Sequence, residues 1–228
     1  MLIETILTPA LFHLHNEDIE NKQVVVIDIL RATTTMVAAF ENGAKSVVSV
    51  EHLEDALLYR EQGYLIAGER NGLKVDGFDM GNSPQEFTKN VVEGQNIVLS
   101  TTNGTKAINA CSAAKYRYVS SFRNIDAMAK TIIENNLDVL LFCAGWKDKF
   151  NLEDTVFAGA LAQQLIDNGF TTNDDATRMA CLLWNIAKPN LSNFLADASH
   201  VQRFKTLHIE SDLEVCLRFN TYNGVVMV

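Results

Sequence analysis

The chain of 228 residues has few cysteines and no long apolar segment. The cysteines lie more than thirty positions apart, at Cys111, Cys143, Cys181 and Cys216. This spacing provides neither a C-x-x-C metal knuckle nor a disulfide framework. No apolar run approaches the roughly 20 residues that a membrane helix needs, and the first residues lack the features of a signal peptide. We therefore expect a cytoplasmic protein with reduced thiols that does not contact membranes.

Positive charge is also scarce. Lys and Arg number 19 against 28 Asp and Glu, which gives a net charge of −9. This balance argues against a nucleic-acid or anionic-membrane binder, because phosphate backbones need a basic face. A small anionic ligand would need a local patch of Arg, Lys, backbone N–H groups or a metal ion.

Proline is rare, at 3 residues, and 47% of the chain is hydrophobic, so the sequence has the composition of a folded domain with a large core. Short apolar runs alternate with amphipathic stretches along the chain. The runs predict strands at 24–30, 46–50, 64–68, 96–100, 116–120, 138–144 and 225–228. The stretches predict helices from Thr33–Thr35 to Gly43 and at 53–62, 83–94, 105–113, 125–135, 152–168, 176–187, 193–207 and 213–219.

This alternation predicts an α/β fold with three layers in the order αβα and a mostly parallel sheet, followed by a helical C-terminal third. We expect a single domain over residues 1–228, with any smaller lobe confined to about 170–228. Ser83, Pro84 and Glu86 form a capping pattern that is typical of a helix start.

Polar residues gather where the predicted strands end. In open α/β sheets, ligands bind beyond the carboxyl ends of the strands. These positions hold carboxylates, two arginines and a hydroxyl-rich turn, namely Asp28, Arg31, Glu69, Arg70, Thr101–Thr105, the loop residues Asp79, Asn82 and Ser83, and Glu153 and Asp154. Together they outline a site for an anion and a divalent cation.

The turn Thr101-Thr102-Asn103-Gly104-Thr105 follows an apolar strand and opens a helix. Free N–H groups and the positive end of the helix dipole would face a ligand there, and Gly104 would allow close approach. The alternative is that Thr102 or Asn103 only caps the helix.

Asp28 lies at the end of a nearly continuous apolar strand, where burying a carboxylate is costly unless it is paired or bound to metal. An ion pair between Asp28 and Arg31 is the structural alternative, and Glu69 with Arg70 has the same alternative. Glu153 and Asp154 have a purely structural explanation, because acidic residues are favoured in the first turn of a helix.

The sequence motifs of several known enzyme classes are absent from the chain. No G-x-x-x-x-G-K-[ST] loop, G-x-G-x-x-G turn or G-x-S-x-G elbow occurs. The position two residues after Asp28 is Leu30, which excludes the haloacid-dehalogenase pattern, and the position six after Cys143 is Lys149, where a cysteine phosphatase needs Arg. The five histidines are scattered, and only His200 is a candidate site residue. Because the candidate metal ligands are mainly carboxylate oxygens, with little usable His or Cys, the sequence favours Mg²⁺ over Zn²⁺.

The segment Asp28–Thr34 resembles the opening motif of the 2-phosphosulfolactate phosphatase family. Further motifs of that family follow in the same order at Gly68–Arg70, Gly77–Pro84, Thr101–Thr105, Cys143–Gly145 and Glu153-Asp154. The resemblance covers roughly residues 24–160, and Ser199, His200 and Asp212 resemble the family more loosely.

The resemblance implies a Mg²⁺-dependent phosphatase that hydrolyses 2-phospho-3-sulfolactate, or a similar small anionic phosphomonoester, to sulfolactate and phosphate. In archaea this step belongs to coenzyme M synthesis. A substrate that carries both phosphate and sulfonate agrees with the arginines and hydroxyls predicted at the strand ends.

We expect Asp28, Arg31 and Glu69 to be catalytic, with Arg31 neutralising charge in the transition state. The predicted Mg²⁺ ligands are Asp28 and Glu69, joined by Asp79 or Asp154. Arg70 or Lys74 would bind the sulfonate or carboxylate. The other predicted substrate-binding residues are Asn82, Ser83, Thr101, Thr102, Asn103, Gly104 and Thr105.

Other interpretations remain open at this stage. Cys143 could act as a covalent nucleophile, or be a small buried strand residue. The chain could bind anions without catalysis as a regulatory protein, or transfer the phosphoryl group to an acceptor other than water. A homodimer is the default expectation for a soluble enzyme of this size.

Overall fold

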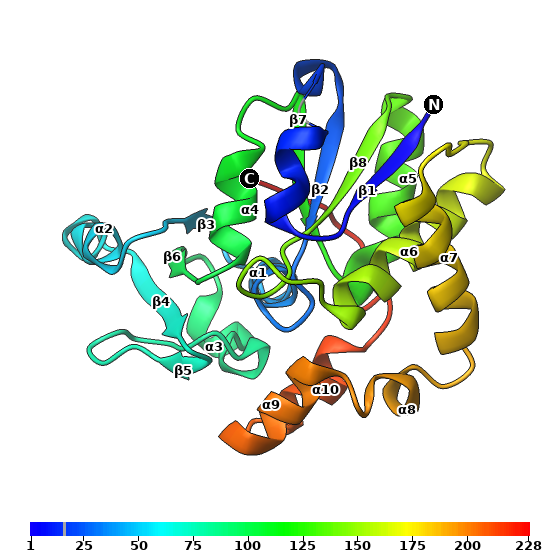
Figure 1. Cartoon of the computed structure of the whole chain (residues 1–228). Coiled ribbons are helices and arrows are strands. Elements are labelled where there is room, and N and C mark those ends of the chain that lie inside the picture. The colour runs from blue at the N-terminus through cyan, green and yellow to red at the C-terminus, as the bar shows by residue number, and fades with distance from the viewer. Residues whose placement is uncertain (16) are drawn as a thin grey trace.

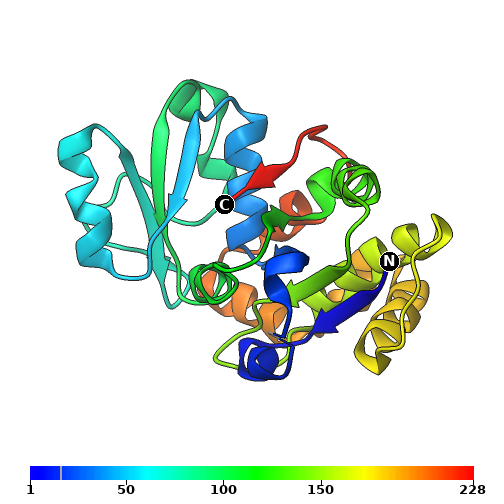
Figure 2. The same cartoon turned by 90° about the horizontal axis from the view of Figure 1, so that it is seen from above.

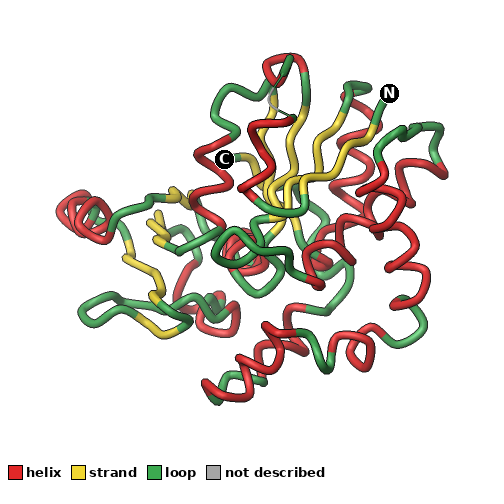
Figure 3. The backbone as a smooth tube through the Cα atoms, in the orientation of Figure 1, coloured by secondary structure: helices red, strands yellow, loops and turns green. Residues whose placement is uncertain are grey.

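The computed structural model describes residues 1–15 and 17–228, and its strands form two sheets rather than one (Figure 3). The larger sheet has the order β1 (Ile3–Ile6), β8 (Val139–Cys143), β2 (Gln23–Ile27), β7 (Tyr116–Ser120) and β9 (Val226–Met227). Its pairs are parallel up to β7, and β9 is antiparallel to β7. The smaller sheet has the order β3 (Ser46–Ser49), β6 (Asn96–Ser100), β4 (Leu65–Arg70) and β5 (Leu73–Lys74), with only the β4–β5 pair antiparallel.

Helices surround and separate the sheets (Figure 1). The α-helices are α1 (Ala32–Glu41), α2 (Leu53–Leu58), α3 (Lys89–Val92), α4 (Gly104–Ala110), α5 (Ile125–Asn135), α6 (Leu152–Asp167), α7 (Asp175–Ala187), α8 (Leu191–Leu195), α9 (Ser199–Leu207) and α10 (Ser211–Cys216). Short 3₁₀ turns lie at Pro9–Leu14, Ile19–Asn21, Arg60–Gln62, Pro84–Glu86 and Phe122–Asn124.

Helices α1 and α4 lie between the two sheets (Figure 2). Their apolar residues, such as Met36 and Ile108, share one core with Val26 of β2 and Leu99 of β6. A second core lies on the opposite face of the larger sheet, where α5 and α6 cover it, and a small third core lies under α2. Strand β2 is buried along its whole length because helices cover both of its faces.

The α/β class, the mostly parallel pairing and the helical layers are confirmed. The strands expected from apolar runs are present, whereas β1 and β5 were not predicted. Helices α8, α9 and α10 replace the two helices expected over 193–219, because Ala198 is extended between α8 and α9. Their buried residues, including Leu195 and Val201, belong to the same core as β2 and α6.

The helix predicted at 83–94 is a further correction. Ser83 does accept a hydrogen bond from the Gln85 N–H, but only the 3₁₀ turn Pro84–Glu86 follows, and α3 begins separately at Lys89. Phe87 leaves the helical conformation at ψ 55° and is fully buried in the core between the sheets. Core packing therefore outweighs the local capping signal. Within the described part of the chain, no helix is long and apolar enough to cross a membrane.

Candidate active site

A cavity with about 530 Å³ of empty space opens where the strand ends of both sheets meet helix α9. Residues at or after the ends of β2, β4 and β6 form one side of it, as expected for parallel strands. The predicted site residues that line the cavity are Asp28, Arg31, Glu69, Asn82, Thr101, Thr102 and Asn103. Loops that are far apart in the sequence therefore share a single cavity.

Asp28 is held where β2 leads into α1. Its Oδ1 accepts a hydrogen bond from the Ala32 N–H at 3.1 Å, and its backbone carbonyl accepts one from the Thr33 hydroxyl. Burial raises the pKa of the Asp28 carboxyl from 3.8 to about 6, although the nearby His200 and the Ala32 N–H lower it. Oδ2 makes no hydrogen bond with the residues that the structure describes, so it can meet a ligand.

Glu69 joins two loops. Its Oε2 accepts the Gly72 N–H at 2.6 Å, and its Oε1 accepts both the N–H and the hydroxyl of Thr102 at 3.0 Å. The predicted alternative, an ion pair with Arg70, is not formed. Arg70 instead donates to the carbonyls of Glu69 and Glu51 and to the Ser100 hydroxyl, and it does not line the cavity.

The Thr-rich turn does not cap α4 through a side chain. Asn103 occupies the cap position without a side-chain cap bond, and its Oδ1 accepts the Lys147 N–H at 3.3 Å instead. Thr105 lies behind the cavity, where its hydroxyl bonds to Ser49. Gly104 is also behind the cavity wall, and it allows close packing: an added Cβ would lie 2.7 Å from the Cβ of Ala32.

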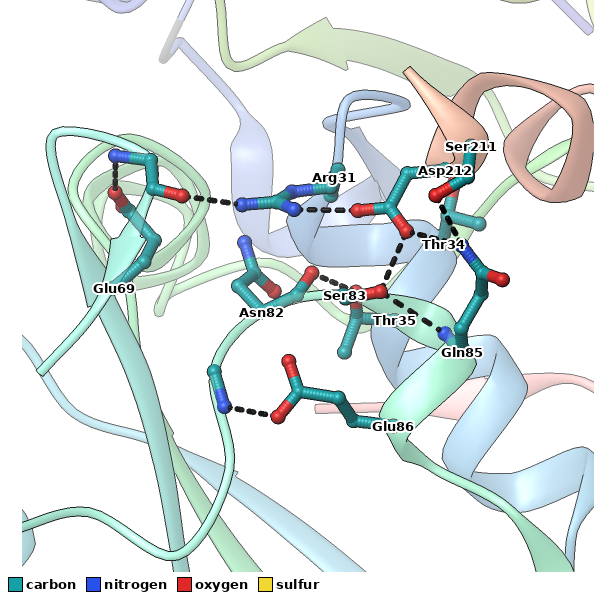
Figure 4. A network of polar contacts seen from close by, with 12 residues as sticks. Arg31, Thr34, Thr35, Glu69, Asn82, Ser83, Gln85, Glu86, Ser211 and Asp212 are labelled. Atoms are coloured by element: carbon teal, nitrogen blue, oxygen red, sulfur yellow. Dashed lines mark hydrogen bonds and ion pairs between the residues drawn. The ribbon is translucent and has the colours of Figure 1, made fainter. Parts of the chain in front are cut away.

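Arg31 is fixed by an acidic residue from the C-terminal third of the chain rather than by Asp28 (Figure 4). Its guanidinium donates to Asp212 Oδ2 and to the Gly72 carbonyl. The other oxygen of Asp212 accepts hydrogen bonds from Ser83 and Gln85. Ser83, predicted to bind substrate, therefore supports Asp212 and does not line the cavity.

Asn82 carries an unsatisfied polar atom. Its backbone carbonyl accepts a hydrogen bond from Thr35, but its side-chain Oδ1 is buried without a partner among the described residues. Buried carbonyl oxygens are almost always paired, so an orphan that lines a cavity indicates a missing ligand. The side chain lies beside Arg31 in Figure 4.

Of the four carboxylates predicted to bind metal, only Asp28 and Glu69 line the cavity. Asp79 is exposed outside the cavity, where it accepts the Ile66 N–H and pairs with Arg60. Both oxygens of Asp154 accept backbone N–H groups, from Ile29 and Gly145. Across residues 1–15 and 17–228, no group of three or more His, Cys, Asp or Glu side chains is arranged to hold a metal ion. Asp79 and Asp154 do not line the cavity, and their oxygens are occupied by backbone N–H groups and by Arg60, so we assign them structural roles.

His200 belongs to the cavity. Its Nδ1 lies 2.7 Å from Oε1 of Glu153, which is 1% exposed on the first turn of α6. Asn151 Nδ2 lies 3.2 Å from the same Nδ1, but the contact with the carboxylate is shorter, and an ionised carboxylate can only accept. We therefore assign the proton to Nδ1, which leaves Nε2 as the free ring nitrogen. The structural explanation for Glu153 as a helix-dipole residue is incomplete, since Glu153 also orients a histidine.

Sequence reasoning missed most of a second wall of the cavity. This wall consists of Trp146 and Lys147 in the loop after β8 and of residues on α9. The α9 residues are His200, Arg203, Phe204 and Leu207, whose spacing puts them on one helix face. That spacing could have indicated a helix face that lines a site, but the core-facing residues of an ordinary amphipathic helix have the same spacing.

Cys143 does not act in this cavity. Its side chain is fully buried in β8, and burial raises the pKa of its thiol well above the usual value. Because the thiolate is the nucleophilic form, such a thiol is inert. All four cysteines of the chain are free, in line with the expected reduced thiols.

Comparison with known proteins agrees with the resemblance inferred from the motifs. A family model described as 2-phosphosulpholactate phosphatase matches residues 6–228. A relative named "Probable 2-phosphosulfolactate phosphatase" from Caldanaerobacter subterraneus is 33% identical, over 93% of this chain and 90% of the relative. Relatives with the same name are 38% identical in Thermotoga petrophila (91% and 89% covered) and 39% identical in Prochlorococcus marinus (84% and 82% covered).

Proposed function

The chain belongs to the 2-phosphosulfolactate phosphatase family, and from this premise we propose that its cavity hydrolyses 2-phosphosulfolactate to sulfolactate and phosphate with the help of Mg²⁺. The family makes it a phosphoric monoester hydrolase. The observation that carries the proposal is the convergence of two carboxylates, a buried arginine and an orphaned amide oxygen on one cavity. A purely regulatory anion binder is not favoured, because the relatives are named as phosphatases.

The donor atoms fit Mg²⁺. This ion prefers oxygen ligands and is usually held by one or two carboxylates together with water and substrate phosphate. Asp28 supplies a carboxylate oxygen without a hydrogen bond, and the unpartnered Oδ1 of Asn82 supplies a neutral oxygen. Glu69 also lines the cavity, but its oxygens already accept hydrogen bonds from Gly72 and Thr102, so it would hold the ion through a remaining lone pair or a bridging water. When bound, the ion would polarise the phosphoryl group and lower the pKa of a coordinated water.

The residues around these oxygens bind and stabilise the phosphoryl group. Arg31 is held rigidly by Asp212 and the Gly72 carbonyl, so its charge is already in place when negative charge builds up on the phosphoryl oxygens. The hydroxyl of Thr101 and the side chain of Asn103 line the same cavity and can donate to the substrate.

The ring of His200 can take part in the proton transfers of the reaction. A water attacks phosphorus, the bond between phosphorus and the ester oxygen breaks, and the departing alkoxide needs a proton. Nε2 of His200 carries no proton while Nδ1 donates to Glu153, so we assign to it the proton that the attacking water loses, and the alkoxide takes its proton from solvent. Glu153 therefore acts through the histidine by fixing its tautomer and orientation.

Phosphate release from 2-phosphosulfolactate tests the function. EDTA should abolish release and added Mg²⁺ should restore it. At saturating Mg²⁺, Asp28→Asn should lower kcat by about 10²–10³-fold, the usual effect of removing one charge-stabilising group. Asp79→Asn is the matched control, because this carboxylate lies outside the cavity, and its kcat should stay near that of the wild type. EDTA-resistant turnover, or normal turnover by Asp28→Asn, would contradict the proposal.

A further inference from the structure

The cavity contains two cations that the proposed phosphoryl chemistry does not use. Lys147 Nζ lies 4.8 Å from the centre of the Trp146 ring, and Arg203 Cζ lies 4.6 Å from the same centre. All three residues line the cavity, Trp146 and Lys147 from the loop after β8 and Arg203 from α9. We call them the Trp146 cluster. A tryptophan that carries two cations is an arrangement that concentrates positive charge at one point.

These cations have no carboxylate partners in the described part of the chain. Arg203 donates to the backbone carbonyl of Asn71, and neither Arg203 nor Lys147 forms a salt bridge there. Arg31, by contrast, is neutralised by Asp212. In a protein of net charge −9, two cations that face a cavity without counter-charges favour an anion as their partner.

The backbone beside the cluster is strained in a way that supports a functional role. Trp146 and Lys149 exchange two backbone hydrogen bonds of 3.0 Å around a two-residue turn. Both central residues have positive φ, 52° at Lys147 and 57° at Asp148, which is the pattern of a type I′ turn. Asn-Gly is the favoured pair there, so lysine is a costly choice, and such strain gathers at binding sites.

We propose that the Trp146 cluster binds the sulfonate of the substrate and thereby sets the enzyme's preference for sulfonated phosphomonoesters. This inference rests on the proposed function and deepens it. Two cations can contact a sulfonate, whose single negative charge is shared by three oxygens, and the indole ring offers an apolar wall to the methylene that carries it.

The cluster replaces the residues that the sequence suggested for this task. Arg70 is saturated by carbonyls and Ser100, and Lys74 donates to the backbone carbonyl of Asp79 at an exposed position. Neither residue lines the cavity.

A matched pair of substrates tests the proposal. 2-Phospholactate keeps the phosphate and carboxylate of 2-phosphosulfolactate and lacks only the sulfonate. The wild type should prefer the sulfonated ester, and Arg203→Gln should reduce kcat/KM for it by about tenfold to a hundredfold, the worth of a hydrogen bond to a charged group. kcat/KM for 2-phospholactate should change less than about twofold. Arg203→Lys keeps the charge but not the planar fork, so it should recover part of the preference.

Lys147→Asn adds a second variant that the turn tolerates. Asparagine suits a positive φ, so the loop should remain folded while the cation is lost, and the sulfonate preference should fall by about two- to fivefold. Lys205→Gln is the control, since it removes an equal charge from an exposed position on α9 outside the cavity. It should leave both substrates unaffected.

The outcomes separate the two proposals. If the wild type hydrolyses both esters equally well, or if Arg203→Gln slows both to the same extent, the sulfonate assignment is overturned while the phosphatase function stands. If the wild type releases phosphate from neither ester, the proposed function itself fails.

Discussion

The two walls of the cavity are built in different ways. On the strand-end wall, which comprises Asp28, Arg31, Glu69 and the turn after β6, the charged groups are tied by hydrogen bonds to buried backbone or to Asp212. The second wall is formed by the Trp146 cluster and the cavity face of α9. Its two cations rest on the indole ring, with one side-chain bond from Arg203 to Asn71, while Glu153 holds His200 and the Lys147 N–H donates to Asn103.

The difference indicates a division of labour. Groups that stabilise a transition state work best when they are fixed in advance, as on the strand-end wall. Long cations stacked on an indole ring keep more freedom, which suits recognition of a peripheral group of the substrate. The two walls meet where the guanidinium of Arg31 lies 5.3 Å from the ring centre of Phe204 on α9.

The largest effect should come from breaking the link between the C-terminal third and the strand-end wall. Asp212 is 2% exposed and pairs with the buried Arg31. Asp212→Asn removes the counter-charge of the buried Arg31 guanidinium, which should lower the free energy of unfolding by about 3–5 kcal/mol. Urea denaturation measures the loss, and kcat should fall with it because Arg31 is no longer fixed.

Glu214→Gln is the control for this prediction. Glu214 lies on the same helix, α10, and its exposed pair with Arg218 should contribute less than about 1 kcal/mol. An Asp212→Asn protein as stable as this control would show that α10 does not hold the strand-end wall.

The two walls of the cavity also differ in how far the sequence predicts them. The apolar runs 24–30 and 96–100 were enough to place Asp28 and Thr102 after strand ends. Their strands belong to different sheets, however, so their meeting in one cavity depends on how the two sheets pack around α1 and α4. The second wall depends in addition on how α9 packs across the strand ends, and no local pattern specifies either packing. His200 was the one candidate histidine because it follows Ser199 and the pair loosely resembles the family, and its contact with Glu153 was not predicted.

The sequence also could not show which buried carboxylates are free to bind a ligand. Asp28 and Asp154 have the same side chain and are both buried near strand ends, yet only Asp28 has an oxygen free to meet a ligand. The difference lies in backbone N–H groups of Ile29 and Gly145, whose positions come from the tertiary fold. Residue type and spacing cannot show which acceptors are already satisfied.

A smaller effect should follow from overpacking the strand-end wall where Gly104 of α4 meets Ala32 of α1. In Gly104→Ala, the new Cβ would lie 2.7 Å from the Cβ of Ala32 and 3.0 Å from Oδ2 of Asp28. Overpacking of this kind costs about 1–3 kcal/mol of stability, and the shift of Asp28 should also lower kcat. Lys106→Ala, on the exposed side of the same helix, should change stability by less than about 0.5 kcal/mol. Equal stability and kcat in the two variants would show that α4 can move away freely.

The smallest expected effect concerns the strained turn at Lys147 and Asp148 on the second wall. Asp148 has φ 57° at the second central position of the turn, where glycine is favoured, and its side chain is exposed. Asp148→Gly should therefore raise the free energy of unfolding by about 0.5 kcal/mol, or Tm by roughly 1–2 °C, and leave the sulfonate preference unchanged. A gain in stability together with a loss of sulfonate preference would mean that the strained turn itself positions Lys147. No gain would mean that the turn relaxes at no cost, so strain would no longer count as support for a binding role of this wall.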